Sequence, residues 1–390
     1  MKWEKVKIGE LFQIKHGWAF KGEYFSNEGE LIIVTPGNFY EGGGFRQVGG
    51  KEKFYTGDFP QEFLLKKNDV IIAMTEQGPG LLGSPALVPA DEKYLHNQRI
   101  GLINEIDNTR IDKEFIYRLF YTAIVRNEIF GSATGTKVKH TAPKRIYSIE
   151  VEIPPLSTQR RIASILSAYD DLIENNLRRI KLLEEKAFLT YKHIVREEQL
   201  EKHILSEFGD IITGKTPSTV IADNFGDDVP FIKTPDMHNQ IFVEHTDQML
   251  SELGAKSQEK KILPPLSLCV SCIGTAGVVG ITSKPSQTNQ QINSIVFYEP
   301  ENVYFFYALM SQMKEQLDAL GSNGSTFTNV NKNKFENMEV YVPNKKVLIE
   351  FTQEFEAPFN LILTLQKQNT KLREARDILL PRLMNGEIEV

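Results

Sequence analysis

An internal duplication is the feature that most constrains how this chain can fold. Several short segments of the first half recur in the second half, in the same order and at a nearly constant offset. A period this long exceeds the roughly 20–45 residues of a solenoid repeat, so it indicates a duplicated domain. The recurring pairs are 34–39 with 232–237, 69–74 with 267–272, 97–103 with 289–295, 131–136 with 321–326, and 149–154 with 338–343.

Each copy ends in a stretch that predicts a long helix. Residues 157–200 contain neither Gly nor Pro, and apolar side chains occupy every seventh position. This spacing is typical of a coiled coil. We expect Ser157 to cap a helix that begins near Thr158. The apolar positions are Leu166, Ile173, Ile180, Ala187 and Ile194 in the first helix, and Phe351, Leu365, Leu372 and Leu379 in the second.

Two asparagines and a proline interrupt these patterns. Asn176 and Asn369 fall on the apolar seams, where a buried Asn would weaken a coiled coil but fix its register. The alternative is that each Asn lies at the solvent edge of its seam. Pro358 is expected to kink the second helix or to move its true start.

The segments ahead of each helix read as short strands, because they are rich in Ile and Val and bounded by Gly, Pro, Asn or Asp. Helix-like stretches at 113–130 and 303–320 precede a Gly-containing loop in each copy. The predicted fold class is α+β, with two similar globular α/β domains that are each followed by a long coiled-coil helix. The predicted boundaries are a domain at 1–156, a long helix at 157–200, a domain at 201–344 and a long helix at 345–390.

The segment that leads into the first helix carries a family resemblance. It reads Ile153-Pro154-Pro155-Leu156, followed by Gln159 and an Ile/Leu heptad helix. Together with the duplication, this layout resembles the specificity (S) subunit of type I restriction–modification systems over essentially the whole chain. The second copy departs from the pattern, because a single proline precedes Asn344 and Glu350 stands where the Gln would fall. The resemblance there rests on the repeat.

The resemblance implies a protein that reads DNA and catalyses nothing itself. Each globule would be a target-recognition domain for one half of a bipartite site in double-stranded DNA. The two long helices would separate the domains as an antiparallel two-helix coiled coil, which relates the domains by a pseudo-twofold. The coiled coil would set the spacing and dock two methyltransferase (modification) subunits, and restriction (motor) subunits would join for cleavage. The implied cofactors lie in those partners: S-adenosylmethionine in the modification subunit, ATP and Mg in the motor subunit, and none in this chain. The alternative within the same class is an S-like subunit of another defence or methylation assembly.

The candidate DNA contacts lie mainly in the loop before each final strand. The formal net charge of −6 argues mildly against a nucleic-acid binder that acts alone, so local charge is more informative. Residues 131–145 hold basic residues and a His without any acid, and residues 321–334 also lack acids. Lys and Arg neutralise phosphates, whereas Asn, Gln and Arg can read adenine or guanine edges; the alternative for both loops is a solvated turn. The candidates are Thr136, Lys137, Lys139, His140, Lys144 and Arg145 in the first loop, Asn323, Thr326, Asn329, Asn331, Lys332 and Lys334 in the second, and Gln98, Arg99, Gln290 and Gln291 in the segment that recurs at 97–103 and 289–295. The alternative for these last four residues is that they are structural amides.

A phosphate-loop pattern at residues 209–216 makes a nucleotide-binding enzyme the alternative from a different class. Such a loop needs a buried strand before it and a helix that starts at its Lys-Thr pair, here Lys215 and Thr216. Pro217 follows at once, and the first copy has Trp18 where the second has Lys215. We therefore expect a turn here rather than a nucleotide site.

Cys269 and Cys272 have the spacing of half a zinc site or of a redox pair. The chain has no second Cys pair, so we expect two strand cysteines and no metal site. Such sparse cysteine usage is typical of a reducing cytoplasm, where we expect the protein to reside. No apolar run approaches the roughly 20 residues of a membrane helix, so no membrane association is expected.

Overall fold

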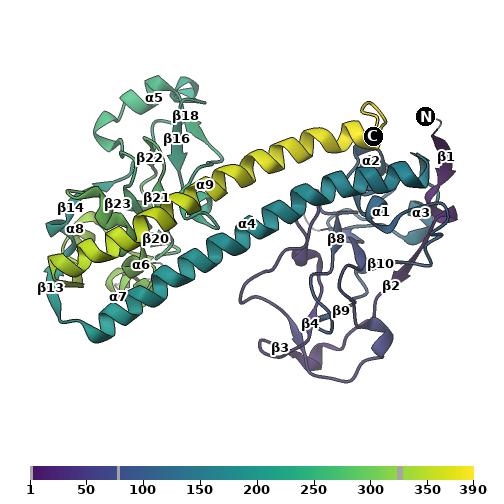
Figure 1. The fold of residues 1–390 in the computed structure, drawn as a ribbon, viewed down its shortest axis with the longest axis horizontal. Coiled ribbons are helices and arrows are strands. Elements are labelled where there is room, and N and C mark those ends of the chain that lie inside the picture. Colours follow the sequence, from purple (N-terminus) through teal and green to yellow (C-terminus); the bar gives the residue numbers. More distant parts are fainter. Residues whose placement is uncertain (1–2, 77–79, 323–327) are drawn as a thin grey trace. The chain divides into compact units, whose positions relative to one another are not determined.

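The computed structural model describes residues 3–76, 80–322 and 328–390 (Figure 1). The chain divides into two compact units, which we call unit 1 (Met1–Asp171 with Arg373–Val390) and unit 2 (Leu172–Leu372). Two long helices, α4 (Leu156–Glu197) and α9 (Lys345–Met384), each contribute residues to both units. Helix α4 begins one residue before and ends three residues before the predicted 157–200, whereas α9 begins at the predicted residue 345 but ends at Met384, before the predicted residue 390.

Unit 1 is built around an antiparallel sheet with the order β2-β10-β6-β8. A smaller sheet, β3-β5-β4-β9, packs beside it, and two further pairs are β1 with β12 and β7 with β11. The strands are β1 (Glu4–Lys7), β2 (Gln13–His16), β3 (Phe25–Ser26), β4 (Ile32–Ile33), β5 (Phe54–Tyr55), β6 (Val70–Ala73), β7 (Thr75–Glu76), β8 (Pro85–Leu87), β9 (Tyr94–Leu95), β10 (Ile100–Asn104), β11 (Lys139–His140) and β12 (Glu150–Ile153), and the short helices are α1 (Lys113–Leu119), α2 (Ala123–Gly131) and α3 (Pro143–Tyr147).

Unit 2 repeats this plan around the sheet β14-β23-β19-β21-β17. Its smaller sheet is β15-β18-β16-β22, and its further pairs are β13 with β25 and β20 with β24. The strands are β13 (Leu200–Ile204), β14 (Gly209–Thr213), β15 (Phe225–Gly226), β16 (Val229–Ile232), β17 (Phe242–Val243), β18 (Met249–Leu250), β19 (Leu268–Ser271), β20 (Ile273–Gly274), β21 (Val279–Thr282), β22 (Gln287–Thr288), β23 (Ile292–Phe297), β24 (Thr328–Asn329) and β25 (Glu339–Pro343), and the short helices are α5 (Glu252–Lys256), α6 (Val303–Met310), α7 (Lys314–Gly321) and α8 (Lys332–Glu336).

The two units match strand by strand, which confirms the duplicated fold. The order β2-β10-β6-β8 corresponds to β14-β23-β19-β21, and the parallel pair β4 with β9 corresponds to β16 with β22. Unit 2 adds the edge strand β17 and the helix α5. The helix-like stretches at 113–130 and 303–320 each form two short helices instead of one.

The strand β6 of unit 1 is apolar throughout because both of its faces are buried. In β6, Val70 and Ile72 join the core formed with the helices, whereas Ile71 and Ala73 join the core formed with the smaller sheet. Successive side chains of a strand point to opposite faces, so a strand between two cores needs apolar residues at every position. Cys269 of β19 likewise faces the smaller core of unit 2.

Helix α4 begins at Leu156, so the expected cap at Ser157 is wrong. The carbonyl of Pro155 accepts hydrogen bonds from the backbone amides of Thr158 (2.8 Å) and Gln159 (3.0 Å), which places Ser157 inside the first turn. The fully buried Gln159 side chain donates to the carbonyls of Pro154 and Arg110 and accepts from the amide of Asp112. This Gln of the Pro-Pro-Leu segment therefore ties the start of α4 to the start of α1.

Helix α9 runs uninterrupted through Pro358, so the proline does not move its start. A proline inside a helix loses one hydrogen bond and costs about 3 kcal/mol. Its neighbours Phe355 and Phe359 are fully buried, and each buried Phe contributes roughly 1.5–3 kcal/mol. Packing on both sides of Pro358 therefore offsets the lost backbone bond.

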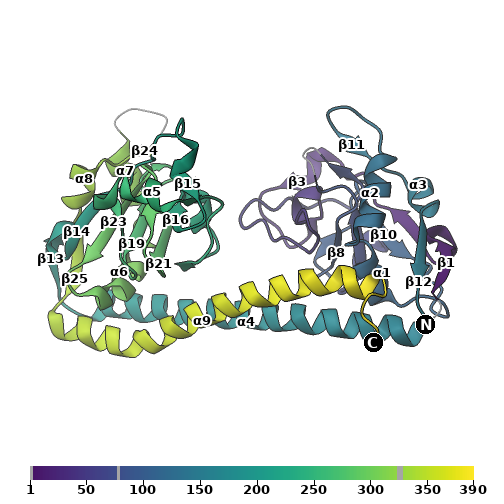
Figure 2. The same cartoon turned by 90° about the horizontal axis from the view of Figure 1, so that it is seen from above.

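Within each unit the two long helices run antiparallel to each other, as their chain direction in Figures 1 and 2 shows. In unit 1, Leu166 near the start of α4 shares a core with Leu383 near the end of α9. In unit 2, Ile194 near the end of α4 shares a core with Phe351 near the start of α9. The heptad positions identified in the sequence are therefore buried, except for Leu372 and Leu379, which are partly buried.

Unit 1 also contains a charged cluster where α1 meets both long helices. The Arg118 side chain of α1 is only 2% exposed, and its guanidinium lies 2.5 Å from a carboxylate oxygen of Asp170 in α4. The other oxygen of Asp170 accepts a hydrogen bond from Arg376 of α9 at 2.7 Å. The Ser167 hydroxyl accepts a further bond from Arg118 at 3.0 Å. One carboxylate thus joins three helices.

The two asparagines of the seam face each other within unit 2. The Asn176 amide donates to the side-chain oxygen of Asn369 at 3.0 Å, and the Asn369 amide donates to the carbonyl of Ile173 at 3.4 Å. Both side chains are buried, at 7% and 1% exposure. A polar pair that bonds only when aligned is suited to specifying register, and that role stays a prediction.

Replacing Asn369 with Leu should destabilise the chain by about 1–3 kcal/mol, because Asn176 would keep buried polar groups without a partner. Replacing both Asn176 and Asn369 with Leu should restore or raise stability, since an apolar pair leaves nothing unsatisfied. Chemical denaturation of the full chain measures both changes. Asn175→Leu, on the exposed side of the same helix turn, is the matched control. A double variant less stable than Asn369→Leu would contradict this account.

Candidate nucleic-acid interface

The predicted basic loop of unit 1 forms a closed hairpin. Thr134 and His140 exchange two backbone hydrogen bonds, of 3.0 and 2.8 Å, and β11 pairs with β7. Gly135 has a φ of +102°, and a Cβ there would lie 2.0 Å from the carbonyl oxygen of Val138. Only glycine fits this turn, which leaves Thr136 and Lys137 exposed at its tip. Figure 2 draws β11 on the side of unit 1 away from α4.

The basic residues of this loop divide into two groups. The Lys139 ammonium lies 3.4 Å from the centroid of the Phe130 ring, and Arg145 donates to the carbonyl of Ser132 at 2.6 Å. These two side chains are partly buried and hold the loop in place. Lys137, His140 and Lys144 are exposed, so their side chains can reach a phosphate.

In the corresponding loop of unit 2, both lysines contact other groups of the protein. Asn331 caps α8 by accepting a hydrogen bond from the amide of Lys334, whose ammonium donates to the carbonyl of Leu320 at 2.7 Å. Lys332 lies 3.8 Å from Glu336, and Asn329 is exposed on β24. Both Asn331 and Lys334 therefore support the loop itself. The remaining two candidates, Asn323 and Thr326, lie outside the described residues.

The recurring turn has the same conformation in both units. The side-chain oxygen of Asn97 accepts from the amide of Arg99 at 3.0 Å, and that of Asn289 accepts from the amide of Gln291 at 3.1 Å. These Asx turns leave Gln98, Arg99 and Gln290 exposed, whereas Gln291 is half-buried and accepts a bond from the Asn289 amide.

The structure brings the turn and the loop together in each unit. In unit 1 the amide of Met74 donates to the carbonyl of Arg99 at 3.0 Å, and the carbonyl of Met74 accepts from the amide of Thr141 at 3.0 Å. In unit 2, Cys272 makes the same two bonds, to Gln291 at 2.7 Å and Val330 at 2.9 Å. Two strand spacings amount to about 10 Å, so both candidate segments belong to one surface.

Two residues of this surface were not among the sequence candidates. The Trp18 amide donates to the carbonyl of His96 at 2.8 Å, and the Lys215 amide makes the equivalent bond to Thr288 at 2.9 Å. Trp18 and Lys215 therefore occupy the same place, beside Gln98 and Gln290 respectively, and both are exposed. The alignment of the two copies, which pairs Trp18 with Lys215, is the sequence signal that could have identified them.

His96 supports the unit 1 turn from inside the protein. Its Nε2 lies 2.8 Å from the carbonyl oxygen of Ile100, and burial lowers its pKa from 6.5 to about 4. In the unfolded chain the His96 imidazole takes up a proton near pH 6.5, whereas in the folded chain it does so only near pH 4. The contribution of neutral His96 to the free energy of unfolding is therefore fully present above pH 6.5 and falls by about 3 kcal/mol as the pH drops to 4.

Replacing His96 with Thr, the residue at the equivalent position 288 of unit 2, should reduce the dependence of the free energy of unfolding on pH. Denaturation curves from pH 4 to 7 measure this dependence. The control His193→Thr, at an exposed position, should leave it unchanged.

The sequence profile of the type I restriction modification DNA specificity domain matches residues 1–185 and 197–370, one match for each repeat. The chain belongs to this specificity-domain family. The two matched stretches correspond closely to the repeats recognised from the sequence and to the two sets of matching strands.

The chain is also similar to individual members of the specificity-domain family. The chain is 46% identical over 190 residues to the HindI specificity subunit of Haemophilus influenzae, a match that covers 48% of this chain and 41% of that subunit. It is 26% identical over 321 residues to the MjaIX specificity subunit of Methanocaldococcus jannaschii, covering 74% of this chain and 72% of that one. The solved S subunit from M. genitalium has the same fold, with a TM-score of 0.63 at 17% identity over 98% of this chain and 96% of that one.

The patterns set aside in the sequence also have structural explanations in this specificity-domain chain. Residues Gly209–Thr213 form strand β14, paired with β23, so the glycine of the phosphate-loop pattern opens a strand and not a loop. Cys269 and Cys272 are buried, which raises the pKa of their thiols to about 12 and about 11. Among the described residues no group of His, Cys, Asp or Glu is placed to hold a metal ion, and no helix there is long and apolar enough to span a membrane.

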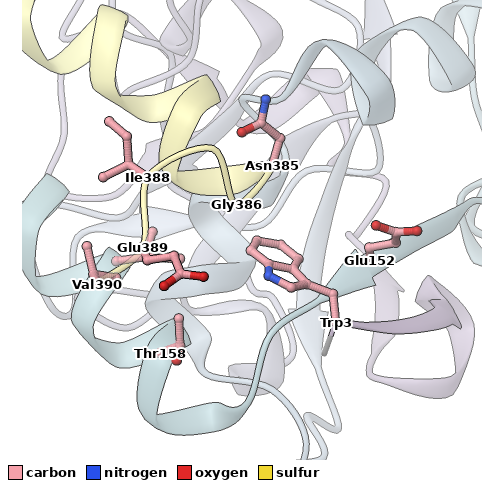
Figure 3. A pocket seen from close by; sticks show the side chains of 9 residues that line it. Trp3, Glu152, Thr158, Asn385, Gly386, Ile388, Glu389 and Val390 are labelled. Carbon is pink, nitrogen blue, oxygen red and sulfur yellow. The ribbon is translucent and has the colours of Figure 1, made fainter. Parts of the chain in front are cut away.

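A pocket of about 350 Å³ lies elsewhere in unit 1, between the last residues of the chain and the start of α4 (Figure 3). Trp3, Glu152, Thr158 and Glu389 are among the side chains that line it. Two carboxylates would repel a DNA phosphate, so this pocket is not part of the candidate interface.

Proposed function

We propose that this chain is the DNA-recognition (S) subunit of a type I restriction–modification enzyme, with each unit reading one half of a bipartite site. The observation that carries the proposal is the surface formed twice, by a loop and an Asx turn joined through Met74 in unit 1 and Cys272 in unit 2. The backbone hydrogen bonds of this surface are the same in both units, whereas its exposed side chains differ apart from the shared Gln98 and Gln290. Different side chains on one scaffold are suited to reading two different half-sites.

The two halves should differ in how they bind. Unit 1 exposes Lys137, Lys144 and Arg99, which favour phosphate contacts and a strong salt dependence. Among its described residues, unit 2 exposes a single basic side chain beside its turn, Lys215, together with Gln290 and Asn329, whose amides favour base edges. We infer that unit 1 supplies more of the electrostatic affinity, and unit 2 relatively more of the base readout.

In this proposal the chain is a recognition subunit without catalytic residues of its own. Methylation of adenine would be performed by two modification subunits that carry S-adenosylmethionine, and cleavage by restriction subunits that use ATP and Mg. The long helices α4 and α9 would dock the modification subunits and set the gap between the half-sites. The helix pairing and the buried polar pair of unit 2 support this role for the two helices.

Sequencing of methylated adenines tests the proposal. The chain is co-expressed with the modification subunit of its own system in a host that lacks other adenine methyltransferases. The expected result is methylation at one motif that consists of two different short half-sites at a constant gap. Methylation that appears without this chain, or none with both subunits present and soluble, would contradict the proposal.

A further inference from the structure

The end of the phosphate-loop pattern in unit 2 is built against the Gln290 turn. A Cβ on Gly214 would lie 2.1 Å from the carbonyl oxygen of Asn289, so only glycine allows the two backbones to approach this closely. The Lys215 amide donates to the carbonyl of Thr288 at 2.9 Å. We call residues 214–216 the unit 2 corner. It presents Lys215 and Thr216 to the same surface as Gln290.

Thr216 orients Gln290. Its hydroxyl donates to the side-chain oxygen of Gln290 at 2.7 Å. An amide oxygen accepts two hydrogen bonds, so Gln290 keeps one free acceptor position beside its two N–H donors. A glutamine that offers an acceptor and a donor side by side matches the N6 and N7 atoms of adenine in the major groove. The Thr216 bond holds the exposed side chain in one orientation before DNA arrives.

The corner is also fixed from inside. The amide of Gln258, a side chain only 7% exposed, donates to the carbonyl of Lys215 at 2.8 Å and to the side-chain oxygen of Gln287 at 2.6 Å. Gln287, fully buried, donates in turn to the carbonyl of Ala255 at 2.8 Å. This network connects the corner to α5, a helix without a counterpart in unit 1. A surface group held by buried bonds loses little freedom when it binds.

Unit 1 has the same corner with different chemistry. A Cβ on Gly17 would lie 2.2 Å from the carbonyl oxygen of Asn97, and the amide of Gln98 donates to the carbonyl of Trp18 at 3.0 Å. The glutamine is therefore common to both units. Its neighbour is the indole of Trp18, 40% exposed, where unit 2 has the ammonium of Lys215.

We propose that Gln290, positioned by Thr216, reads an adenine in the half-site of unit 2, and that Lys215 contacts a phosphate next to it. This inference rests on the proposed function and names a specificity-determining residue, a positioning residue and a phosphate contact for it. The Lys-Thr pair that completes the phosphate-loop pattern thus serves DNA and not a nucleotide.

Selection from a pool of randomised DNA duplexes tests the inference, with the full chain assembled with its modification subunits. Gln290→Ala should lower the preference for adenine at one position of one half-site by about 10-fold or more, and leave the other half-site unchanged. Thr216→Val should relax the same position by about fivefold, the effect of one neutral hydrogen bond. In the Gln290→Ala background Thr216→Val should have no further effect. Lys215→Ala should reduce the salt slope of binding by about one unit without altering base preference.

Thr219→Val, at an exposed position of the same segment, is the matched control and should change nothing. Unchanged adenine preference in Gln290→Ala would overturn the inference while the proposed function stands, provided that the unaltered complex selects a bipartite site. Effects of Thr216→Val and Gln290→Ala that simply add would overturn the positioning role of Thr216. An unaltered complex that selects no sequence would contradict the proposed function itself.

Discussion

Replacing Lys137 and Lys144 together with Ala is expected to weaken DNA binding by on the order of 10- to 100-fold near 0.1 M salt. Both lysines are exposed on the closed loop of unit 1, whereas Lys139 and Arg145 are occupied in holding that loop. Each phosphate contact contributes about 0.9 to the slope of log K against log salt, so the double variant should lose about 1.8. Binding isotherms at several salt concentrations measure both quantities.

The matched control replaces Lys51 and Lys67, two exposed lysines on other segments of unit 1, with Ala. This control changes the net charge by the same amount, so it measures how much affinity depends on the total charge of the protein. Base preference should be unaffected in both double variants, because a lysine–phosphate contact carries no sequence information. Equal losses of affinity in the two variants would show that total charge matters and that the loop has no special role.

Replacing Asp170 with Ala is expected to destabilise unit 1 by about 3 kcal/mol, near the lower end of the range for a broken buried ion pair because Asp170 is itself 31% exposed. The loss would leave the buried guanidinium of Arg118 beside Arg376 without the carboxylate that joins them. Hydrogen exchange of the α1 amides in the full chain measures the stability of unit 1 separately from that of unit 2.

Two further variants separate charge from packing at this cluster. Glu150→Ala removes an ion pair of similar length, 2.6 Å from Lys5, in which both side chains are at least half exposed, and it should change little. Asp170→Leu combined with Arg118→Met should be less harmful than Asp170→Ala alone, since no buried charge is left unpaired. Protection in α1 that is unaltered by Asp170→Ala would show that the cluster does not hold unit 1 together.

The candidate site was only partly predictable. The acid-free loops and the Asn-Gln turns are local patterns, and they identified Lys137, Lys144, Gln98 and Gln290, all of which are exposed. Sequence reasoning assigned Asn331 to the same role, but its side chain caps α8. Asn can either cap a helix or read a base, and only the position at which the helix starts shows which role a given Asn has.

The sequence by itself determined the duplication, because short segments recur in the same order in both halves. It also determined the two heptad helices and the strand-rich segments, because periods of 3.5 and of two are local properties of the chain. It also located Asn176 and Asn369 on their seams. Only the tertiary structure decided that these two side chains, 193 residues apart, bond to each other, and that Met74 and Cys272 join each turn to its loop. Such pairings depend on competition among distant backbone and side-chain groups for partners, and no local pattern records which of them meets which.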